Sequence, residues 1–521
     1  MNIPFILEKA ISLYENKEAV ISQGKRFTYG GFASRVYRLS NLFKQIGLSK
    51  GHCIAILHHN SHEFLEAYFA AAQIGAILNP LNFRLSPAEL AFVLNDSEAT
   101  VLIAASRFTS LLQEMLQHKT KVKTLILTGP GEGSVSLPLE TLGYDHEIAA
   151  QNTPNPPKPN IQDDEIAHLY YTSGTTGKPK GVMLTHKNVC IHALAAIAEL
   201  GLRDTDVWIH AAPLFHLADA WATFAITWVG GRHVTVPEFK PELVMDTMEK
   251  EKVTITNMIP TMLNMLVNTP GIESYDFSSL RVMLSGGAPI APDVVKRIME
   301  TFKCDYIQTY GMTETSPYLT LSILKENLLH LPYDQKFRYK AKTGRPFLGV
   351  LLKVVREDGT EVTPNGEEVG EIIVKGDIVT PGYWNNPEET AKAIKDGWLH
   401  TGDMAVIDKE GYVNIVDRKK DMIITGGENV YSVEVENVLY KHPAVLEAAV
   451  IGVPDSKWGE AVKAVVVLKE GHNATEEELI AFCKERIAHY KAPKSVDFVE
   501  ELPKTGSGKI YKKGLKDRYW A

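Results

Sequence analysis

The pattern of apolar and polar positions alternates between helical and strand periods along the first half of the chain. Residues 61–75 (SHEFLEAYFAAAQIG) are rich in alanine and predict a buried helix that ends at a glycine. Residues 101–104 and 123–127 are short β-type apolar runs that end in turn residues. Such alternation predicts α/β layers with largely parallel strands.

The pattern becomes polar at residues 152–165 (NTPNPPKPNIQDDE), which are rich in proline. Composition alone leaves two interpretations equally open here, a domain boundary and a surface connection within one domain. From about residue 344, short β-type runs are separated by Asp-Gly, Asn-Gly and Glu-Gly turns, which predicts an antiparallel section. The runs lie at 351–355, 371–374 and 412–416.

Beyond residue 420 the pattern predicts a compact unit of two helices and two strands. The helices are expected at 433–440 and 475–487, and the strands at 448–453 and 464–468. A unit of about 100 residues has the size of a small α+β domain.

Composition and charge narrow the class of protein. The chain has 521 residues, 45% of them hydrophobic, and a net charge of -8, which argues against a nucleic-acid partner. The longest apolar stretch, 220–229, is well short of the roughly 20 residues that span a bilayer. The apolar run at the N-terminus ends at Leu7, too early for a signal peptide. With four scattered cysteines and no C-x-x-C pair, we expect a cytoplasmic protein with reduced thiols and no integral membrane segment.

The most informative segment is YTSGTTGKPKG at residues 171–181. Its glycines allow backbone N–H groups to converge, and its hydroxyl and lysine side chains add donors, so it predicts a nest for polyphosphate. It is not a Walker A loop, because Pro179 follows Lys178. TGSGKI at 505–510 fails the same test, because Ile510 follows Lys509.

Six further motifs follow in a fixed order. They are SGGAP at 285–289, YGMTE at 310–314, WLHTGD at 398–403, DRKKDMI at 417–423, GGENVY at 426–431 and PKTGSGKI at 503–510. Together with the phosphate loop they resemble the adenylate-forming superfamily, which comprises acyl-CoA synthetases, peptide-synthetase adenylation domains and luciferases. The resemblance covers essentially the whole chain and is closest to fatty-acid-type acyl-CoA synthetases.

This resemblance implies a fold and a reaction. The fold class is α/β: a large N-terminal domain of α/β layers with a β-rich subdomain over 1–419, and a small mobile C-terminal α+β domain over 420–521. The hinge is expected at Lys420. The implied enzyme uses Mg²⁺ and ATP to convert a carboxylic acid into an acyl-adenylate and pyrophosphate, and then forms acyl-CoA and AMP with coenzyme A.

The resemblance also assigns roles to individual residues. Lys509 would stabilise the adenylation transition state, Thr313 would bind the α-phosphate, and His216 would lie beside the carboxylate. Glu314 would hold magnesium. The implied ATP/AMP site consists of Thr172, Ser173, Gly174, Thr175, Thr176, Gly177, Lys178, Gly286, Gly287, Ala288, Tyr310, Gly311, Thr313, Asp403, Arg418 and Lys509. The implied CoA contacts are Gly427, Trp458, Tyr490 and Lys494, and the implied acyl pocket contains His216, Trp221 and Gly311.

Each assignment has a structural alternative. Thr313 and Glu314 could cap a helix, Tyr310 and His216 could be core residues, and Asp403 with Arg418 could form a surface salt bridge. Lys420 could belong to a solvated charge run, and Lys509 to an ordinary tail.

The sequence says less about which carboxylic acid is activated and which acceptor receives the acyl group. After His216 the family often has a glycine-containing turn, whereas this chain has ADAW, in which Asp219 could meet a polar substrate group or cap a helix. The apolar stretch 220–229 favours a fatty or other apolar acid, although it could also be core. Alternatives to coenzyme A are a separate carrier protein and a luciferase-like oxygenation. The sequence leaves open whether the chain forms a homodimer.

Overall fold

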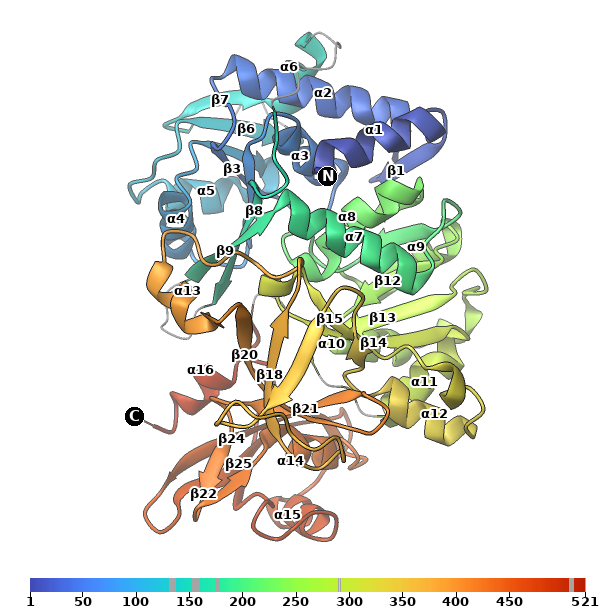
Figure 1. Cartoon of the computed structure of the whole chain (residues 1–521), viewed down its shortest axis with the longest axis vertical. Coiled ribbons are helices and arrows are strands. Elements are labelled where there is room, and N and C mark those ends of the chain that lie inside the picture. The colour runs from blue at the N-terminus through green and yellow to red at the C-terminus, as the bar shows by residue number, and fades with distance from the viewer. Residues whose placement is uncertain are drawn as a thin grey trace.

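The computed structural model describes residues 1–130, 137–151, 160–173, 179–288, 290, 292–505 and 510–520. Figure 1 shows a large body formed by the first four-fifths of the chain and a smaller C-terminal body below it. The predicted division into a large N-terminal α/β domain and a small C-terminal domain is confirmed. No helix among the described residues is long and apolar enough to cross a bilayer.

The first layer of the large domain is a seven-stranded sheet. Its strands are parallel except for the last pair, which confirms the prediction of largely parallel strands. In sheet order they are β7 (Glu140–Gly143), β6 (Thr124–Thr128), β5 (Val101–Ala105), β3 (Cys53–Leu57), β4 (Ile77–Pro80), β8 (Ile166–Ser173) and β9 (Pro179–Thr185). Because β7 and β8 belong to one sheet, residues 152–165 connect parts of one domain and do not mark a domain boundary.

The second layer is a nine-stranded sheet that is parallel from β1 to β14 and antiparallel at both edges. In sheet order its strands are β16 (Arg345–Pro346), β15 (Tyr318–Leu321), β14 (Asp305–Gly311), β13 (Val282–Gly286), β12 (Ile255–Met258), β10 (Val207–His210), β11 (Arg232–Thr235), β1 (Glu18–Ser22) and β2 (Lys25–Thr28).

Five helices join the two sheets through one core: α1 (Ile3–Tyr14), α2 (Tyr29–Gln45), α3 (His62–Gln73), α7 (His186–Leu200) and α8 (Leu217–Val229). The predicted helix at 61–75 is α3, which begins after Ser61, whose hydroxyl accepts a hydrogen bond from the N–H of Phe64. Left-handed Gly201 and Gly230 end α7 and α8. The apolar stretch 220–229 lies in α8 and is mostly buried.

The remaining helices of the large domain cover the outer faces and edges of the two sheets. Those beside the seven-stranded sheet are α4 (Pro87–Asp96), α5 (Thr109–Met115) and α6 (Tyr144–Ala150). Those beside the nine-stranded sheet are α9 (Pro241–Lys250), α10 (Pro260–Val267), α11 (Pro292–Phe302) and α12 (Tyr333–Lys340).

The predicted antiparallel section is a five-stranded sheet that completes the large domain. It contains β17 (Leu351–Val355), β18 (Gly370–Lys375), β19 (Ile394–Lys395), β20 (Trp398–Ile407) and β21 (Val413–Arg418), with α13 (Pro387–Ala393) beside it. The chain leaves the large domain from β21.

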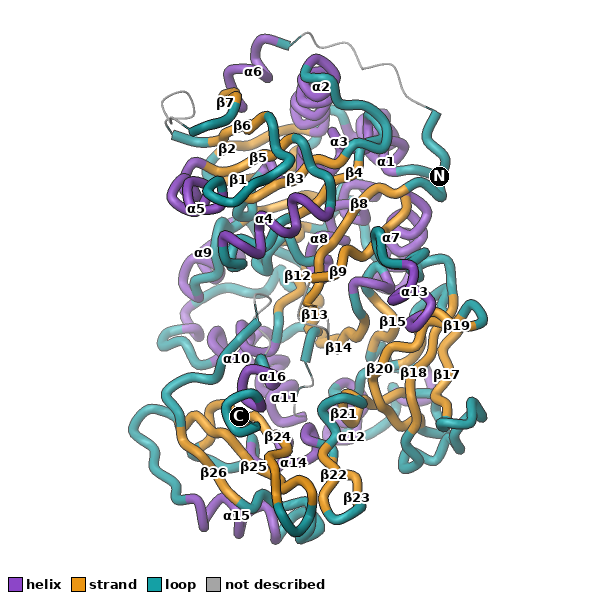
Figure 2. The backbone as a smooth tube through the Cα atoms, turned by 90° about the vertical axis from the view of Figure 1, so that its left-hand side faces the viewer, coloured by secondary structure: helices purple, strands orange, loops and turns teal. Residues whose placement is uncertain are grey.

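The small domain is a mixed sheet with helices packed on it, as the pattern predicts. It contains β22 (Ile423–Thr425), β23 (Glu428–Val430), α14 (Ser432–Leu439), β24 (Val445–Asp455), β25 (Gly459–Leu468), α15 (Glu476–Lys484), β26 (Ser495–Phe498) and α16 (Lys512–Lys516). In both views α16 lies on the side towards the large domain and β22 lies lower in the small domain (Figures 1 and 2), and Figure 2 shows β23 beside β22.

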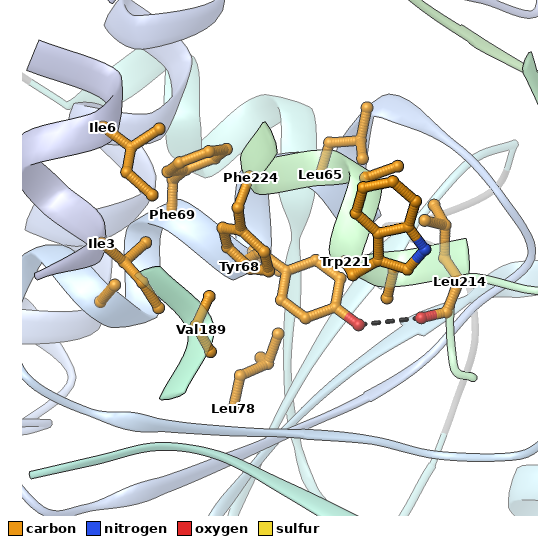
Figure 3. Close-up of a cluster of buried hydrophobic side chains, with 14 of the residues drawn as sticks. Ile3, Ile6, Leu65, Tyr68, Phe69, Leu78, Val189, Leu214, Trp221 and Phe224 are labelled. Atoms are coloured by element: carbon orange, nitrogen blue, oxygen red, sulfur yellow. Dashed lines mark hydrogen bonds between the residues drawn. The ribbon is translucent and has the colours of Figure 1, made fainter. Parts of the chain in front are cut away.

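The core between the two large sheets contains a hydrogen-bonded tyrosine. The hydroxyl of Tyr68 donates to the carbonyl oxygen of Leu214 at 2.8 Å and lies 2.7 Å from the hydroxyl of Tyr170 (Figure 3). Around it pack aromatic rings such as Phe224, whose centroid is 5.6 Å from that of Tyr68. These bonds satisfy polar groups that have no access to water.

We predict that Tyr68→Phe lowers the free energy of unfolding by about 1–3 kcal/mol, because it leaves buried partners unpaired. Urea denaturation followed by circular dichroism measures this change. Tyr14→Phe is the control, because Tyr14 packs at the edge of the same core and shows no hydroxyl hydrogen bond within the described ranges. Equal destabilisation by both variants would contradict the prediction.

Candidate active site

The loop after β13 lies at the carboxyl ends of the parallel strands. It has the predicted strand–loop–helix context, between β13 and α11. A Cβ on Gly286 would lie 2.2 Å from the hydroxyl oxygen of Thr309, so the loop lies directly against β14. The side chain of Gln308 donates to the carbonyl oxygen of Ala288 at 2.9 Å and holds the loop there. Gly287, between Gly286 and Ala288, has a φ of +89°.

The turn after β14 carries the first candidate metal ligand. A Cβ on Gly311 would lie 1.8 Å from the carbonyl oxygen of Pro317, which allows only glycine in this backbone. Thr313 and Glu314 begin a three-residue 3-10 turn, Thr313–Thr315, so they do not cap an α-helix. The buried carboxylate of Glu314 accepts a hydrogen bond from the hydroxyl of Tyr383 at 2.9 Å. Burial raises the pKa of Glu314.

A second buried carboxylate, Asp403, lies on β20. Its Oδ2 accepts a hydrogen bond from the hydroxyl of Tyr310 at 2.7 Å, and its Oδ1 lies 3.1 Å from Nε of Arg418. Asp403 and Arg418 face each other in the register of β20 and β21. The side chain of Asp403 is 5% exposed and that of Arg418 is 51% exposed, so a buried carboxylate meets a guanidinium that reaches the surface. Tertiary structure therefore brings Tyr310, Asp403 and Arg418 together.

The phosphate-loop motif connects β8 and β9. Thr172 lies opposite Lys180, and Ser173 opposite Pro179, in this antiparallel pair. Gly174, Thr175, Thr176, Gly177 and Lys178 lie outside the described residues, as does Lys509. Their predicted roles therefore stay predictions.

Lys180, on β9 after the phosphate loop, is linked to Glu314 by Tyr383 and pairs with Glu389. No sequence motif indicated Tyr383 or Glu389. The ammonium of Lys180 forms an ion pair with Glu389 and lies 5.5 Å from the ring centroid of Tyr383, which binds Glu314. The hydrogen bonds from Lys180 and Lys392 lower the pKa of Glu389 to about 2. Neither Tyr383 nor Glu389 falls in a motif whose spacing indicates chemistry, so only the folded chain reveals them.

The predicted acyl-pocket residues lie around the start of α8. His216 precedes the helix in an extended conformation and is half-buried. Trp221 is buried, and its ring centroid lies 5.1 Å from those of both Trp208 and Tyr318. Burial raises the pKa of Tyr318. These contacts form an aromatic wall beside the loops of β13 and β14.

Among the described residues, the hydroxyl of Tyr318 and the side chain of Asn257 at this wall are incompletely paired. The amide nitrogen of Asn257, at the end of β12, donates to the carbonyl oxygen of Ala218 at 2.6 Å. Its Oδ1 is buried and has no hydrogen-bond partner among the residues described. Trp221 also donates to Ala218, at 3.1 Å. Asn257 therefore lies beside the predicted acyl pocket.

Both predicted roles of Asp219 are wrong. Its carboxylate is fully buried and accepts hydrogen bonds from Nε1 of Trp208 at 3.0 Å and Nδ1 of His210 at 2.6 Å. His210 in turn lies 3.0 Å from His233, so the carboxylate joins a buried network between α8, β10 and β11. This network fixes the orientation of α8, and Asp219 neither caps that helix nor faces a substrate.

The predicted coenzyme A residues lie on the small domain. Gly427 has a φ of +86° in the turn between β22 and β23. Trp458, Tyr490 and Lys494 are exposed. Among the described residues, none of these four forms a hydrogen bond or ion pair with Asp403 or Glu314. Lys420 is exposed just beyond β21.

Comparison with known proteins now decides the family. The family model described as "AMP-binding enzyme" matches residues 7–384, and the model for the "AMP-binding enzyme C-terminal domain" matches residues 434–509. The chain belongs to the AMP-binding enzyme family. The resemblance to adenylate-forming enzymes is thus confirmed.

Relatives support the enzyme class but differ in the acid they are named for. The chain is 39% identical over 502 residues to a feruloyl-CoA synthase of Amycolatopsis sp, covering 96% of each chain. It is 35% identical over 529 residues to a long-chain-fatty-acid–CoA ligase of Thermus thermophilus, covering 100% of this chain and 96% of the relative. An anthranilate CoA ligase with bound anthranoyl-AMP superposes with a TM-score of 0.90 at 28% identity, covering 100% and 97%. The predicted class, an AMP-forming acid–CoA ligase, is confirmed.

We predict opposite pH effects for two neighbouring carboxyl groups. Burial raises the pKa of Glu314 above its usual 4.5. The free energy of unfolding therefore falls as pH rises from 4.5 through the raised pKa of the folded state. Glu314→Gln should therefore raise the melting temperature at pH 8, and by less near pH 4.

The pKa of Glu389 is lowered to about 2, so the stabilisation that its carboxylate provides is present above pH 4.5 and is lost as pH falls. Glu389→Gln should lower the melting temperature at pH 8. Scanning calorimetry at both pH values checks the signs, and shifts of the same sign in the two variants at pH 8 would contradict the prediction.

Proposed function

We propose that this ligase activates a largely apolar carboxylic acid and transfers its acyl group to coenzyme A. The observation that carries the proposal is the convergence of Asp403, Tyr310, Arg418 and Glu314 at the carboxyl ends of the sheet, beside an aromatic wall. The acid carboxylate would attack the α-phosphorus of ATP and expel pyrophosphate. The thiol of coenzyme A would then attack the acyl carbon, with AMP leaving.

The geometry supports an ATP site at Asp403. A carboxylate can accept hydrogen bonds from both hydroxyls of a ribose. Gly286 and Gly287 leave a loop without side chains beside Tyr310, which suits a flat adenine ring. The phosphate loop between β8 and β9 would follow the triphosphate.

Glu314 fits a role as a magnesium ligand. Its buried carboxylate supplies the oxygen donors that Mg²⁺ prefers, and Tyr383 fixes its orientation. When bound with ATP, the ion would neutralise phosphate charge. Lys180 and Glu389 would hold Tyr383 in place from the other side.

The proposed acid class rests on the walls of the pocket. Trp221 and Tyr318 offer aromatic surface, which favours an apolar acyl body, whether a fatty chain or a ring. The ferulate, long-chain and anthranilate relatives show that the family accommodates either kind. The unpaired oxygen of Asn257 would accept a hydrogen bond from a polar substituent on that body.

The test is a thioester assay with Mg-ATP and coenzyme A across acids from acetate to long chains, benzoates, hydroxycinnamates and amino acids. Acyl-CoA and AMP are quantified with and without coenzyme A. Coenzyme A-dependent product with apolar acids is expected. Adenylate without transfer to coenzyme A would favour the alternative acceptor, a separate carrier protein, and exclusive use of small polar acids would contradict the proposed pocket.

We predict that Lys509→Ala slows acyl-adenylate formation by at least a hundredfold, because it removes a charge that stabilises the transition state. Transfer from supplied acyl-adenylate to coenzyme A should change by less than threefold. Pyrophosphate release and thioester formation are measured separately, with Lys513→Ala as the control from the same tail. An equal loss of both half-reactions would refute the role of Lys509.

A further inference from the structure

A buried polar cluster links the two domains just before the predicted hinge. Asp417 is the last but one residue of β21 in the large domain, and its carboxylate accepts hydrogen bonds from the backbone N–H and the hydroxyl of Ser432, at 2.5 and 3.0 Å. Ser432 is the first residue of α14 in the small domain. Both residues are buried, so the contact is shielded from solvent.

A lysine from the C-terminal helix completes the cluster. Nζ of Lys512 donates to the hydroxyl of Ser432 at 2.6 Å and lies 2.7 Å from the carboxylate of Glu436. Burial alone would lower the pKa of Lys512, but Glu436 and Asp417 raise it, so the lysine remains charged. The ammonium thus pairs with Glu436 within the small domain and is connected to Asp417, across the domain boundary, through the hydroxyl of Ser432.

This cluster connects the nucleotide site to the segment that carries Lys509. On one side, the N–H of Arg418 donates to Asp417 at 2.7 Å, and the side chain of Arg418 binds Asp403. On the other side, Tyr511, next to Lys512, donates its N–H to the carbonyl oxygen of Pro503 at 2.7 Å. Pro503 and Tyr511, two described residues on either side of Lys509, are therefore joined next to Lys512.

We propose that Asp417 and Lys512 are positioning residues that hold the small domain in the orientation for adenylation. The proposal rests on the proposed function, in which Lys509 acts at the α-phosphate. Through Ser432, the pair fixes the base of the Lys509 segment relative to Arg418 and Asp403. The hydrogen bonds between Asp417 and Ser432 must break when the small domain turns to bring β22 and β23 to the acyl-adenylate, because Asp417 stays with the large domain.

The consequence is an unequal effect on the two half-reactions. Removing a buried charge that is held by hydrogen bonds weakens only the orientation that contains them. Asp417→Asn should slow pyrophosphate release by about tenfold or more. Thioester formation from supplied acyl-adenylate should stay within twofold of the parent or become faster.

The matched control is Glu434→Gln. Glu434 lies on the same helix and pairs with Lys491 at 2.8 Å entirely within the small domain. It should leave both half-reactions within twofold of the parent. Lys512→Met should reproduce the Asp417→Asn effect, and Lys512→Arg, which keeps the charge, should restore part of the adenylation rate.

A distance measurement decides the proposal independently of any acid. Spin labels at Gln113→Cys on α5 and Glu477→Cys on α15 report the separation of the two domains by pulsed EPR. The described native cysteines are buried. Asp417→Asn should broaden or shift the distance distribution, and Glu434→Gln should not.

Two results would overturn the proposal: an unchanged distance distribution in Asp417→Asn, or an equal loss of both half-reactions in a variant that melts like the parent. If the parent activates no acid in the panel, the proposed function fails. The EPR result then still decides whether Asp417 holds the domain orientation.

Discussion

The ion pair and hydrogen bond at Asp403 hold together the parts of the large domain that build the active site. Tyr310 comes from β14 of the nine-stranded sheet, whereas Asp403 and Arg418 come from neighbouring strands of the antiparallel sheet. A buried carboxylate needs such partners, because leaving its charge unpaired away from water is costly. The requirement fixes how the two sheets meet, and with it the position of the loops after β13 and β14.

The same principle extends outward from Asp403 in two directions. Towards the phosphate loop, Glu314 is oriented by Tyr383, which lies beneath the Lys180–Glu389 pair. Towards the small domain, Arg418 leads to Asp417, Ser432 and Lys512. Most of these contacts are shielded from solvent, although the side chain of Arg418 is 51% exposed. The candidate nucleotide residues Asp403 and Arg418 are thus connected to the residues at the domain boundary.

The residues of the predicted acyl pocket are held in place by other kinds of contact. Trp221 is held by ring contacts, and the helix that carries it is fixed by Asp219, His210 and His233. Trp208 belongs to both groups, because its ring packs against Trp221 and its Nε1 donates to Asp219. The aromatic wall and the buried polar network are therefore coupled through one residue.

The sequence by itself determined the family, the order of layers and the two-domain plan. Gly286, Gly311 and the hairpin turns are local requirements, and a local backbone requirement can be read from neighbouring residues. Residue pattern also located α3, β5 and the small domain within a few positions.

Tertiary structure alone decided the partners of each charge. Tyr383 reaches Glu314, Glu389 reaches Lys180 and Lys512 reaches Ser432 across long stretches of chain. The sequence misassigned Asp219 because spacing along the chain does not show that His210 and Trp208 surround its carboxylate. Such pairings depend on which strands and helices become neighbours, and that is set by packing of the whole chain and not by spacing along it.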